Sequence, residues 1–534
     1  MSARGSTQDP LHGCVVTLDR HSAPRVLYSG ERFVEVHLPP GTRVVYPKPP
    51  LAGLKDPDAA IRYALNHPHG SDPLHALLRP GMKVVIALDD NSMPLPAMRG
   101  PDVRERIITI VLEVLAQHGV DDVEIILATC LHRKLTEPEI RGLVGDRIFN
   151  AYWPDRLHNH DPEAPDAMKL VGETELGERV VLNRKAVESD LIIYANLNLV
   201  AMDGGHKSVA VGLCGYESLK PHHNPRVMRQ CHSYMDPASS ELHTVVDRMG
   251  RVANTHLNVF TIETTINNRA YDSSLAFLAK NEDDLTATER LALKSLLFSL
   301  DRMPERARGA LFHSLVAPYE MTGVFAGSTE AVHPHTVRRT FDQYLVPVHG
   351  QADILIAGIP FLGPYNVNAF LNPLLVQVMA QGYIFNLYRG QPVVKKGGTL
   401  IITHPCTDRF DPYHAPYVEF VHRLLPETRD ALELHRRYEE AFATNPAYLK
   451  LYREGHAFHP AHPFFMWYWG EAGRQWLGRV IVVGADNAYI PRLLGYETAR
   501  TMAEAIEMAK DTAPRSPQIT LLHLPPILQA DVSV

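Results

Sequence analysis

The sequence is poor in cysteine and has no long apolar run, and both absences limit what the protein can be. Five cysteines are spread over 534 residues and none forms a CxxC pair, which favours free thiols over a disulfide framework or a thiolate zinc site. No run of about 18 apolar residues occurs, so no membrane span is expected. The start, MSARGSTQDPLHGC, lacks the apolar segment of a secretion signal. We therefore expect a cytoplasmic protein.

An excess of positive charge and the common nucleotide-binding motifs are also absent. The formal net charge is −7 at pH 7, which argues against a nucleic-acid partner because phosphates are neutralised by clustered Lys and Arg. Neither GxGxxG nor a GKS or GKT loop occurs. What is present is a globular composition, with 45% hydrophobic and 21% charged residues and 28 histidines. The length predicts two or more domains.

Short apolar runs alternate with amphipathic stretches over most of the chain. This alternation is typical of strands followed by helices and predicts mainly parallel sheets. We therefore expect an α/β fold with two Rossmann-like domains, a cleft between them and a helical insertion. The predicted division is an N-terminal domain at 1–270, a helical insertion or linker at 271–322, and a C-terminal α/β domain at 323–534.

The clearest elements can be placed individually. Buried strands are expected at 83–90, 123–133, 352–360, 395–406, 479–487 and 518–526. We also expect a helix at 101–120, a short helix at 135–145 closed by Gly145, and a strand, turn and strand at 180–200. The segment 368–385 is expected to be helical in part and broken or kinked near Pro373.

Polar residues follow the predicted strands, where parallel sheets bind ligands. Asp89 and Asp90 lie in ALDDNSMPLP, where a carboxylate could bind a ribose hydroxyl or a cation, or the loop could only cap a helix. His132 and Arg133 lie in ATCLHRKLTEPEI. There the imidazole could exchange a proton and the guanidinium could hold a carboxylate, or both could belong to a surface turn.

Three further motifs have two interpretations each. In LHNHDPEAPDAM, His158 and His160 together with Asp161 could ligate a metal, or the segment could be a solvated loop. In LNRKAVESD, Arg184 and Lys185 could meet a phosphate or face solvent. HAFHPAH at 456–462 has H-x₂-H-x₂-H spacing, but its prolines discourage a regular helix, so an aromatic loop is favoured over a metal site.

The stretch GGHKSVAVGLCGYESLKPHHNP is rich in groups that could approach a ligand. Gly204 and Gly205 allow close backbone approach and Lys207 adds a charge, although a plain tight turn would use the same glycines. The histidines His206, His222 and His223 are interpreted as incidental.

In their order along the chain, these segments resemble the nickel-dependent lactate racemase (LarA-type) family of 2-hydroxyacid racemases and epimerases. The resemblance runs from the strand at 83–90 to about residue 225 and resumes in parts of the second half. It implies two α/β domains with the site between them. It also implies a nickel-pincer nucleotide that a lysine tethers, a histidine that holds nickel, and two histidines that exchange the substrate proton.

The family pattern transfers only in part. The resemblance implies catalytic roles for His132, Arg133 and, as the candidate second histidine, His160. The cofactor-binding positions it implies are Asp90, Arg184, Lys185, Gly204, Gly205 and Lys207. Arg184 stands where the family has its tethering lysine, and no histidine precedes the glycine turn in NLNLVAMD. An arginine is a poor substitute for an amine that forms a covalent link, so the metal ligands stay unassigned.

The sequence thus leaves three hypotheses. The first is a diverged racemase or epimerase that acts on a 2-hydroxy acid or sugar acid by proton or hydride transfer in the cleft. The second is a metal-independent acid/base enzyme that isomerises, or eliminates a group from, a carboxylate. The third is a non-catalytic ligand-binding relative. A small carboxylate is the expected partner, and homo-oligomerisation stays open.

Overall fold

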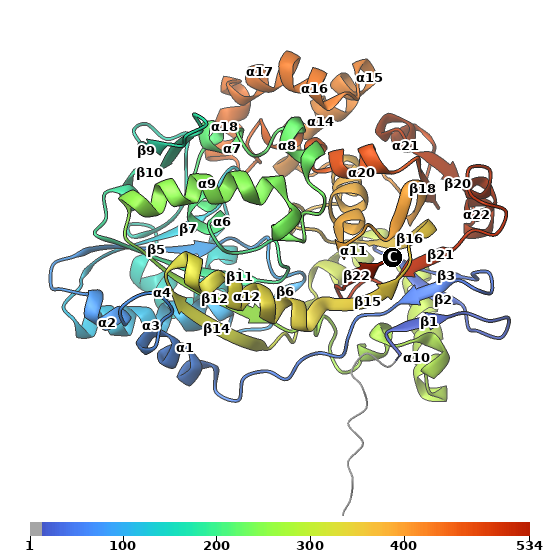
Figure 1. Cartoon of the computed structure of the whole chain (residues 1–534), viewed down its shortest axis with the longest axis horizontal. Coiled ribbons are helices and arrows are strands. Elements are labelled where there is room, and N and C mark those ends of the chain that lie inside the picture. The colour runs from blue at the N-terminus through green and yellow to red at the C-terminus, as the bar shows by residue number, and fades with distance from the viewer. Residues whose placement is uncertain (1–12) are drawn as a thin grey trace, which may run out of the picture.

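The computed structural model describes residues 13–534, and its strands form two main sheets (Figure 1). The expectation of no secretion signal rests on residues that mostly lie outside this described part. Within the described part, no helix is both long and apolar enough to cross a membrane.

The first sheet has six strands, in the order β14-β12-β11-β5-β7-β8. Every neighbouring pair is parallel except β12 with β14. The strands are β5 (Lys83–Asp89), β7 (Asp122–Ala128), β8 (Leu157–Asn159), β11 (Leu191–Asn198), β12 (Val259–Ile266) and β14 (Met321–Gly327). The mainly parallel α/β architecture is the one that the alternating pattern predicted.

The central strands of this sheet are apolar because both faces are covered. All eight residues of β11 are buried, as are five consecutive residues of β5, which is the pattern of strands that helices cover on two sides. Helix α3 (Val103–Gln117) packs on β11, and α12 (Thr329–Tyr344) packs on β12 and β14. The carboxyl ends of β5, β7 and β11 therefore open at one edge of a rigid layer.

The second sheet has nine strands and joins the two ends of the chain. Its main path runs β1-β4-β21-β16-β18-β19-β20, and the hairpin of β2 and β3 pairs with the end of β16. The strands are β1 (Val15–Thr17), β2 (Arg25–Gly30), β3 (Phe33–Val36), β4 (Arg43–Val45), β16 (Ala352–Pro360), β18 (Val394–Thr403), β19 (Arg479–Val483), β20 (Glu497–Ala499) and β21 (Ile519–Leu522). Figure 1 shows the blue N-terminal strands beside red C-terminal ones.

Sheet membership crosses the predicted domain limits. Strands β1 to β4 come from the first 45 residues but lie in the second sheet, and β14 pairs with β12 although the predicted boundary falls inside it. Neighbouring positions in a chain do not decide which sheet edge a strand joins. The division at 270 and 322 stays a prediction about domains.

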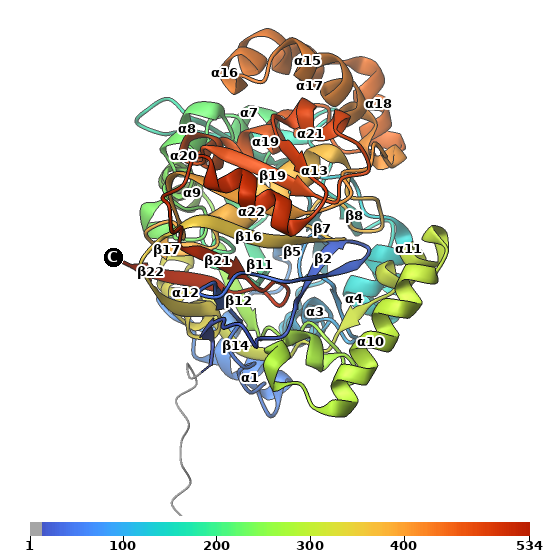
Figure 2. The same ribbon diagram turned by 90° about the vertical axis from the view of Figure 1, so that its right-hand side faces the viewer.

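The helical insertion lies against the β2–β3 hairpin, on one flank of the molecule (Figure 2). Its main helices are α10 (Ala287–Arg302) and α11 (Glu305–His313). Leu293 of α10 packs with Val26 of β2, while Phe312 of α11 packs with Tyr28 and Phe361. Apolar side chains of both helices thus face the hairpin.

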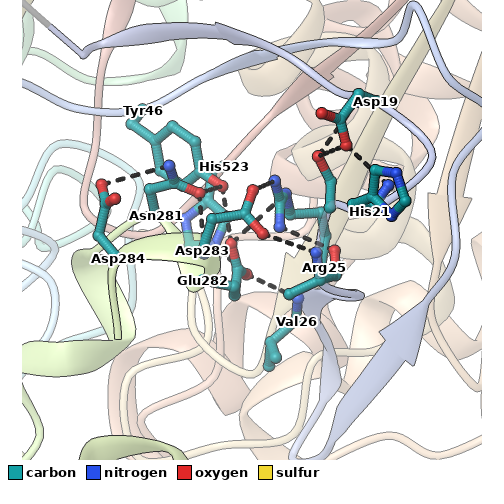
Figure 3. A network of polar contacts seen from close by, with 12 residues as sticks. Asp19, His21, Arg25, Val26, Tyr46, Asn281, Glu282, Asp283, Asp284 and His523 are labelled. Atoms are coloured by element: carbon teal, nitrogen blue, oxygen red, sulfur yellow. Dashed lines mark hydrogen bonds and ion pairs between the residues drawn. The ribbon is translucent and has the colours of Figure 1, made fainter. Parts of the chain in front are cut away.

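A buried carboxylate fastens the start of the insertion to both ends of the chain (Figure 3). Glu282 accepts hydrogen bonds from Val26 N at 2.8 Å and Tyr46 Oη at 2.7 Å, and it contacts His523 Nε2 at 3.1 Å. Burial alone would raise the pKa of Glu282, but His523 and the hydrogen bonds lower it to about 2. Arg25 completes the cluster through Asp283.

Three local predictions differ from the structure. Helix α4 (Glu137–Tyr152) does not close at Gly145, which instead makes a kink with φ of 78°. The segment 180–200 places the short helix α5 (Arg184–Val187) between β10 (Arg179–Asn183) and β11 where a turn was expected. Pro373 begins helix α13 (Pro373–Gln377) and does not break one, because proline is well accommodated in a first helical turn.

Candidate functional site

A cavity of about 130 Å³ lies where the first sheet's carboxyl edge meets parts of the C-terminal half. From the first sheet, its wall includes Asp89, Asp90, His132, Asn196, Gly204 and Lys207; from the C-terminal half, it includes Tyr365 and His462. Tyr365 belongs to the loop after β16, and His462 begins helix α19 (His462–Trp469). Side chains from two separate parts of the fold thus face one small space.

Asp90 and His132 form an ion-pair contact in this wall. The distance from His132 Nδ1 to Asp90 Oδ2 is 2.6 Å, and Ser92 N donates to the other carboxylate oxygen at 2.9 Å. Burial would raise the pKa of Asp90, but His132 and Ser92 lower it to about 2, so the carboxyl is ionised. An ionised Asp90 accepts from Nδ1–H, which leaves Nε2 as the ring nitrogen that can act as a base.

Asp89, the neighbouring carboxyl, has a different environment. Tyr194 Oη donates to it at 3.0 Å and Leu197 N at 2.7 Å. Burial nevertheless dominates and raises the pKa of Asp89 to about 7. Two adjacent aspartates therefore differ in charge at neutral pH, the ionised one supporting His132 and the other partly protonated.

Contacts with neighbouring side chains of the protein fix the turn at Gly204 and Gly205. Gly204 and Gly205 both have positive φ, at 83° and 62°, and a Cβ on Gly204 would lie 2.4 Å from Asn198 Oδ1. Gly205 N donates to the buried Glu263 at 2.6 Å. Gly204 lines the cavity, whereas Gly205 does not, so only the first of the two predicted glycines reaches the cavity.

Lys207 is the single lysine or arginine among the described residues of the cavity wall. Its Nζ lies 3.6 Å from Asp203 Oδ1 and 3.4 Å from Met202 O. Asp203 also accepts from two backbone N–H groups, at 3.0 and 3.1 Å, which fixes the carboxylate beside the ammonium. Lys207 is therefore placed to attract an anionic group into the cavity.

His462 reaches the cavity and was missed as a site residue. Burial keeps the pKa of Tyr417 well above its ordinary value, so the Tyr417 hydroxyl keeps its proton and donates to His462 Nδ1 at 2.5 Å. Burial, followed by nearby imidazoles, also holds the pKa of His462 well below its usual value. A neutral ring that accepts at Nδ1 carries its proton on Nε2. This N–H has no acceptor among the described residues.

The rings of His132, His462 and Tyr365 form a compact group. The His132 and His462 centroids are 5.4 Å apart at 83°, and Tyr365 lies 5.3 and 5.1 Å from them. The Tyr365 hydroxyl is held by that of Tyr383 at 2.9 Å. His132 and His462 therefore face the same part of the cavity.

Other buried polar atoms of the wall also lack partners. Asn196 Oδ1 and Ser208 Oγ, like His462 Nε2, are buried with no hydrogen-bond partner in the described part of the chain. Buried polar groups are ordinarily satisfied. Three such atoms around one cavity indicate a polar occupant.

His222 and His223, interpreted as incidental, lie together. Their Nδ1 atoms are 2.7 Å apart, and His223 lines the cavity. Burial lowers the pKa of both rings, that of His222 to about 3. His223 thus adds a neutral imidazole to the wall, which the local sequence gave no means of recognising.

Two predicted catalytic residues lie outside the wall. His160 is fully buried, contacts Cys214 O at 2.9 Å and is held by Asn183 at 3.0 Å, and burial lowers its pKa to about 4. Arg133 pairs with Glu139 and donates to Val367 O at 3.0 Å. His160 is therefore a satisfied core residue, and Arg133 fastens the loop after β7 to the loop after β16.

The two predicted cofactor residues on α5 lie outside the cavity wall. Arg184 is half-buried and donates to Asp166 O at 2.5 Å, and the exposed Lys185 pairs with Glu124 at 2.8 Å. A covalent tether at this position would need an amine inside the cavity. The residues present at this position do not fit the tethered nickel-pincer nucleotide that the family resemblance implies.

The histidines of HAFHPAH do not converge. His456 contacts Lys134 O, His459 contacts Glu163, and only His462 faces the cavity. Over residues 13–534 no group of three His, Cys, Asp or Glu side chains has the geometry to hold a metal ion. The prediction of an irregular loop was wrong at its end, because Pro463 lies in the first turn of α19, where it needs no N–H partner.

Fold and cavity together define an α/β protein with an acid/base pair at a parallel-sheet edge, and the comparisons with known proteins agree. The lactate racemase N-terminal domain model matches residues 29–235. The lactate racemase of Lactiplantibacillus plantarum is 28% identical over 170 residues, which are 31% of this chain and 38% of that protein. That of Thermoanaerobacterium thermosaccharolyticum is 24% identical over 167 residues, which are 30% and 37%. The matched segments thus span less than two fifths of these relatives.

Solved structures share the fold over a longer part of the chain. The lactate racemase apoprotein from T. thermosaccharolyticum superposes with a TM-score of 0.60 at 17% identity, covering 96% of this chain and all of that one. A protein from Thermotoga maritima gives 0.51 at 14%, covering 90% and 100%. At these identities the likeness shows the fold alone. The resemblance to the lactate racemase family is confirmed by the domain model and by both relatives.

Proposed function

We propose that the chain is a racemase or epimerase that inverts a carbon centre of a small 2-hydroxy acid or sugar acid by proton transfer. The observation that carries the proposal is the Asp90–His132 pair, which faces the same cavity as Lys207. A base, a cation and an unpartnered hydrogen-bond donor in one enclosed space are the groups that this reaction needs. The kinship with lactate racemases supports the same class of reaction.

In this scheme Lys207 binds the substrate and His132 deprotonates it. The ammonium of Lys207 attracts the substrate carboxylate. His132 Nε2 takes the proton from C2, the C–H electron pair moves into the carboxylate, and the resulting positive charge on the ring faces the ionised Asp90. His132 then gives its proton to solvent, and a solvent proton delivered to the opposite face of the planar intermediate inverts the centre.

His462 stabilises the charge that develops on oxygen. Its Nε2–H has no acceptor among the described residues, and its partner Tyr417 fixes the ring. A neutral imidazole held in this way donates a hydrogen bond to an oxyanion without a prior rearrangement. The donor and the base come from different parts of the fold, so they can approach the substrate from different directions.

One placement favours the second hypothesis, an acid/base isomerase or eliminating enzyme that works without a metal. Arg184, at the tether position of the family, lies outside the cavity wall and is paired with Glu188. Both readings use the same base. They differ in whether a tightly bound nickel nucleotide copurifies and in whether activity survives removal of metal.

The test is exchange and inversion at C2. The purified chain is incubated in D₂O with a panel of enantiopure 2-hydroxy acids and sugar acids, and deuterium at C2 and the second stereoisomer are measured. We expect both to appear together for at least one substrate and to vanish in His132→Asn, while the exposed His67→Asn variant stays active. Equal activity in His132→Asn would remove His132 as the base. Formation of a dehydrated product without inversion would identify the eliminating enzyme.

A further inference from the structure

A second cavity, of about 670 Å³, lies at the carboxyl edge of the second sheet. Its floor takes residues that follow β2, β18 and β19, and one side is formed by the start of helix α22 (Met502–Lys510) and by α11 of the insertion. Carboxyl edges of such sheets are where α/β proteins bind ligands. The cavity shares no lining residue with the first one.

His404 supplies a fixed donor in this floor. It is 3% exposed, and its Nδ1 accepts from Cys406 N at 2.9 Å. The ring proton is therefore on Nε2, and burial lowers the pKa of His404 to about 3, which keeps the ring neutral. Nε2 lies against Gly30, whose added Cβ would be 3.2 Å away, and no described residue accepts its proton.

The start of α22 presents two more donors. Thr501 caps the helix by accepting from Glu504 N. The N–H groups of Met502 and Ala503, which line the cavity, donate to no described residue. Nearby, Gly484 ends β19 with a φ of 80° and no atom within 4 Å of its would-be Cβ. Free N–H groups and the positive end of a helix dipole attract anions.

Two arginines of the opposite wall lack a carboxylate partner. Arg308 of α11 is 4% exposed; its Nη1 donates to Met303 O at 3.1 Å, and its Nε has no partner in the described part of the chain. Arg32, on the β2–β3 turn, makes no ion pair with a described residue. Four carboxylates also line the cavity. Glu31 contacts His313 at 3.5 Å and Glu305 pairs with Arg409, whereas Glu35 and Asp486 make no ion pair with a described residue.

We propose that this cavity binds the phosphate group of a small phosphorylated molecule. His404 Nε2–H, the N–H groups at the start of α22 and the guanidinium groups of Arg32 and Arg308 supply the donors. A phosphate offers several acceptor oxygens and a double charge, which suits backbone donors combined with arginine. The remaining volume holds the organic part of the ligand. This site is independent of the reaction proposed for the first cavity.

The test is titration of the full-length protein with inorganic phosphate at constant ionic strength, followed by calorimetry. We expect saturable binding of one phosphate. His404→Asn keeps an acceptor for Cys406 N but removes the Nε2–H donor, and we expect it to weaken binding by about tenfold to a hundredfold. Arg32→Ala, at an exposed position, should weaken binding by a similar factor. Retained thermal unfolding midpoints would show that both variants fold.

Two matched variants separate this site from other cationic surfaces. Arg515→Ala removes an exposed arginine outside both cavities, and Lys207→Ala removes the cation of the first cavity. Both should bind phosphate as the parent does. Absence of saturable binding would overturn the proposal. The proposal would also be overturned if Lys207→Ala abolished phosphate binding while His404→Asn and Arg32→Ala left it intact.

Discussion

Replacing Asp90 by asparagine tests the acid/base pair with little change in shape. Asp90 has a pKa of about 2 although burial would raise it above the ordinary 3.8. That difference corresponds to about 2 kcal/mol of stabilisation of the ionised carboxylate by its surroundings, among which His132 is the largest favourable contribution. Since Asn keeps an oxygen for Ser92 N, the loss falls mainly on the contact with His132. We expect the rate of isomerisation to fall at least about 30-fold.

The rate is measured by deuterium incorporation at C2 at saturating substrate, with the exposed Asp155→Asn variant as the matched control. The carboxylate also contributes to stability with a definite sign. Because its folded pKa is depressed, that contribution is present above pH 3.8 and is lost as the pH falls towards 2. Parent and Asp90→Asn should therefore converge in unfolding free energy in acid. Full activity in Asp90→Asn together with unchanged stability at pH 7 would refute the pairing argument.

Three further predictions follow from other contacts. His462→Asn keeps an acceptor for Tyr417 and loses the Nε2–H, so kcat should fall about tenfold or more while thermal unfolding is retained; an unchanged kcat would exclude the donor role. Asp89 has its pKa raised to about 7, so the folded protein should lose stability as the pH rises from about 4 to 7, by up to about 4 kcal/mol. This loss should be absent from urea unfolding of Asp89→Asn. Glu282→Gln should cost about 3 kcal/mol at pH 7 and speed hydrogen exchange in α10, whereas exposed Glu454→Gln should change neither; equal exchange rates would contradict the anchoring role of Glu282.

The sequence predicted the layers of the fold better than their connections. Buried strands such as β5 and β11 are recognisable because two covered faces demand a continuous apolar run. The pairing of β4 with β21 joins segments more than 470 residues apart. No local pattern encodes it, because strand propensity does not specify a partner.

The candidate site was predictable where its residues lie in the segments that follow parallel strands. Asp90 and His132 come straight after β5 and β7, so the parallel sheet itself brings them together. His462 is 330 positions further along the chain than His132, and its role depends on how α19 packs. His160, predicted as the second acid/base histidine, follows β8 and lies in the core, where Cys214 and Asn183 contact both ring nitrogens.

The candidate site is built from two parts of the fold, the first sheet and the C-terminal half. Its geometry therefore depends on the contacts that hold these two parts together. His132 follows β7 of the first sheet, while His462 and Tyr365 come from the C-terminal half. Arg133 links the same two parts, since it pairs with Glu139 of α4 and donates to Val367 O after β16. The residue predicted to hold the substrate thus holds the two parts of the cavity in place. Loss of this contact would separate His132 from His462, so under the proposed mechanism activity should fall although neither of these two residues had changed.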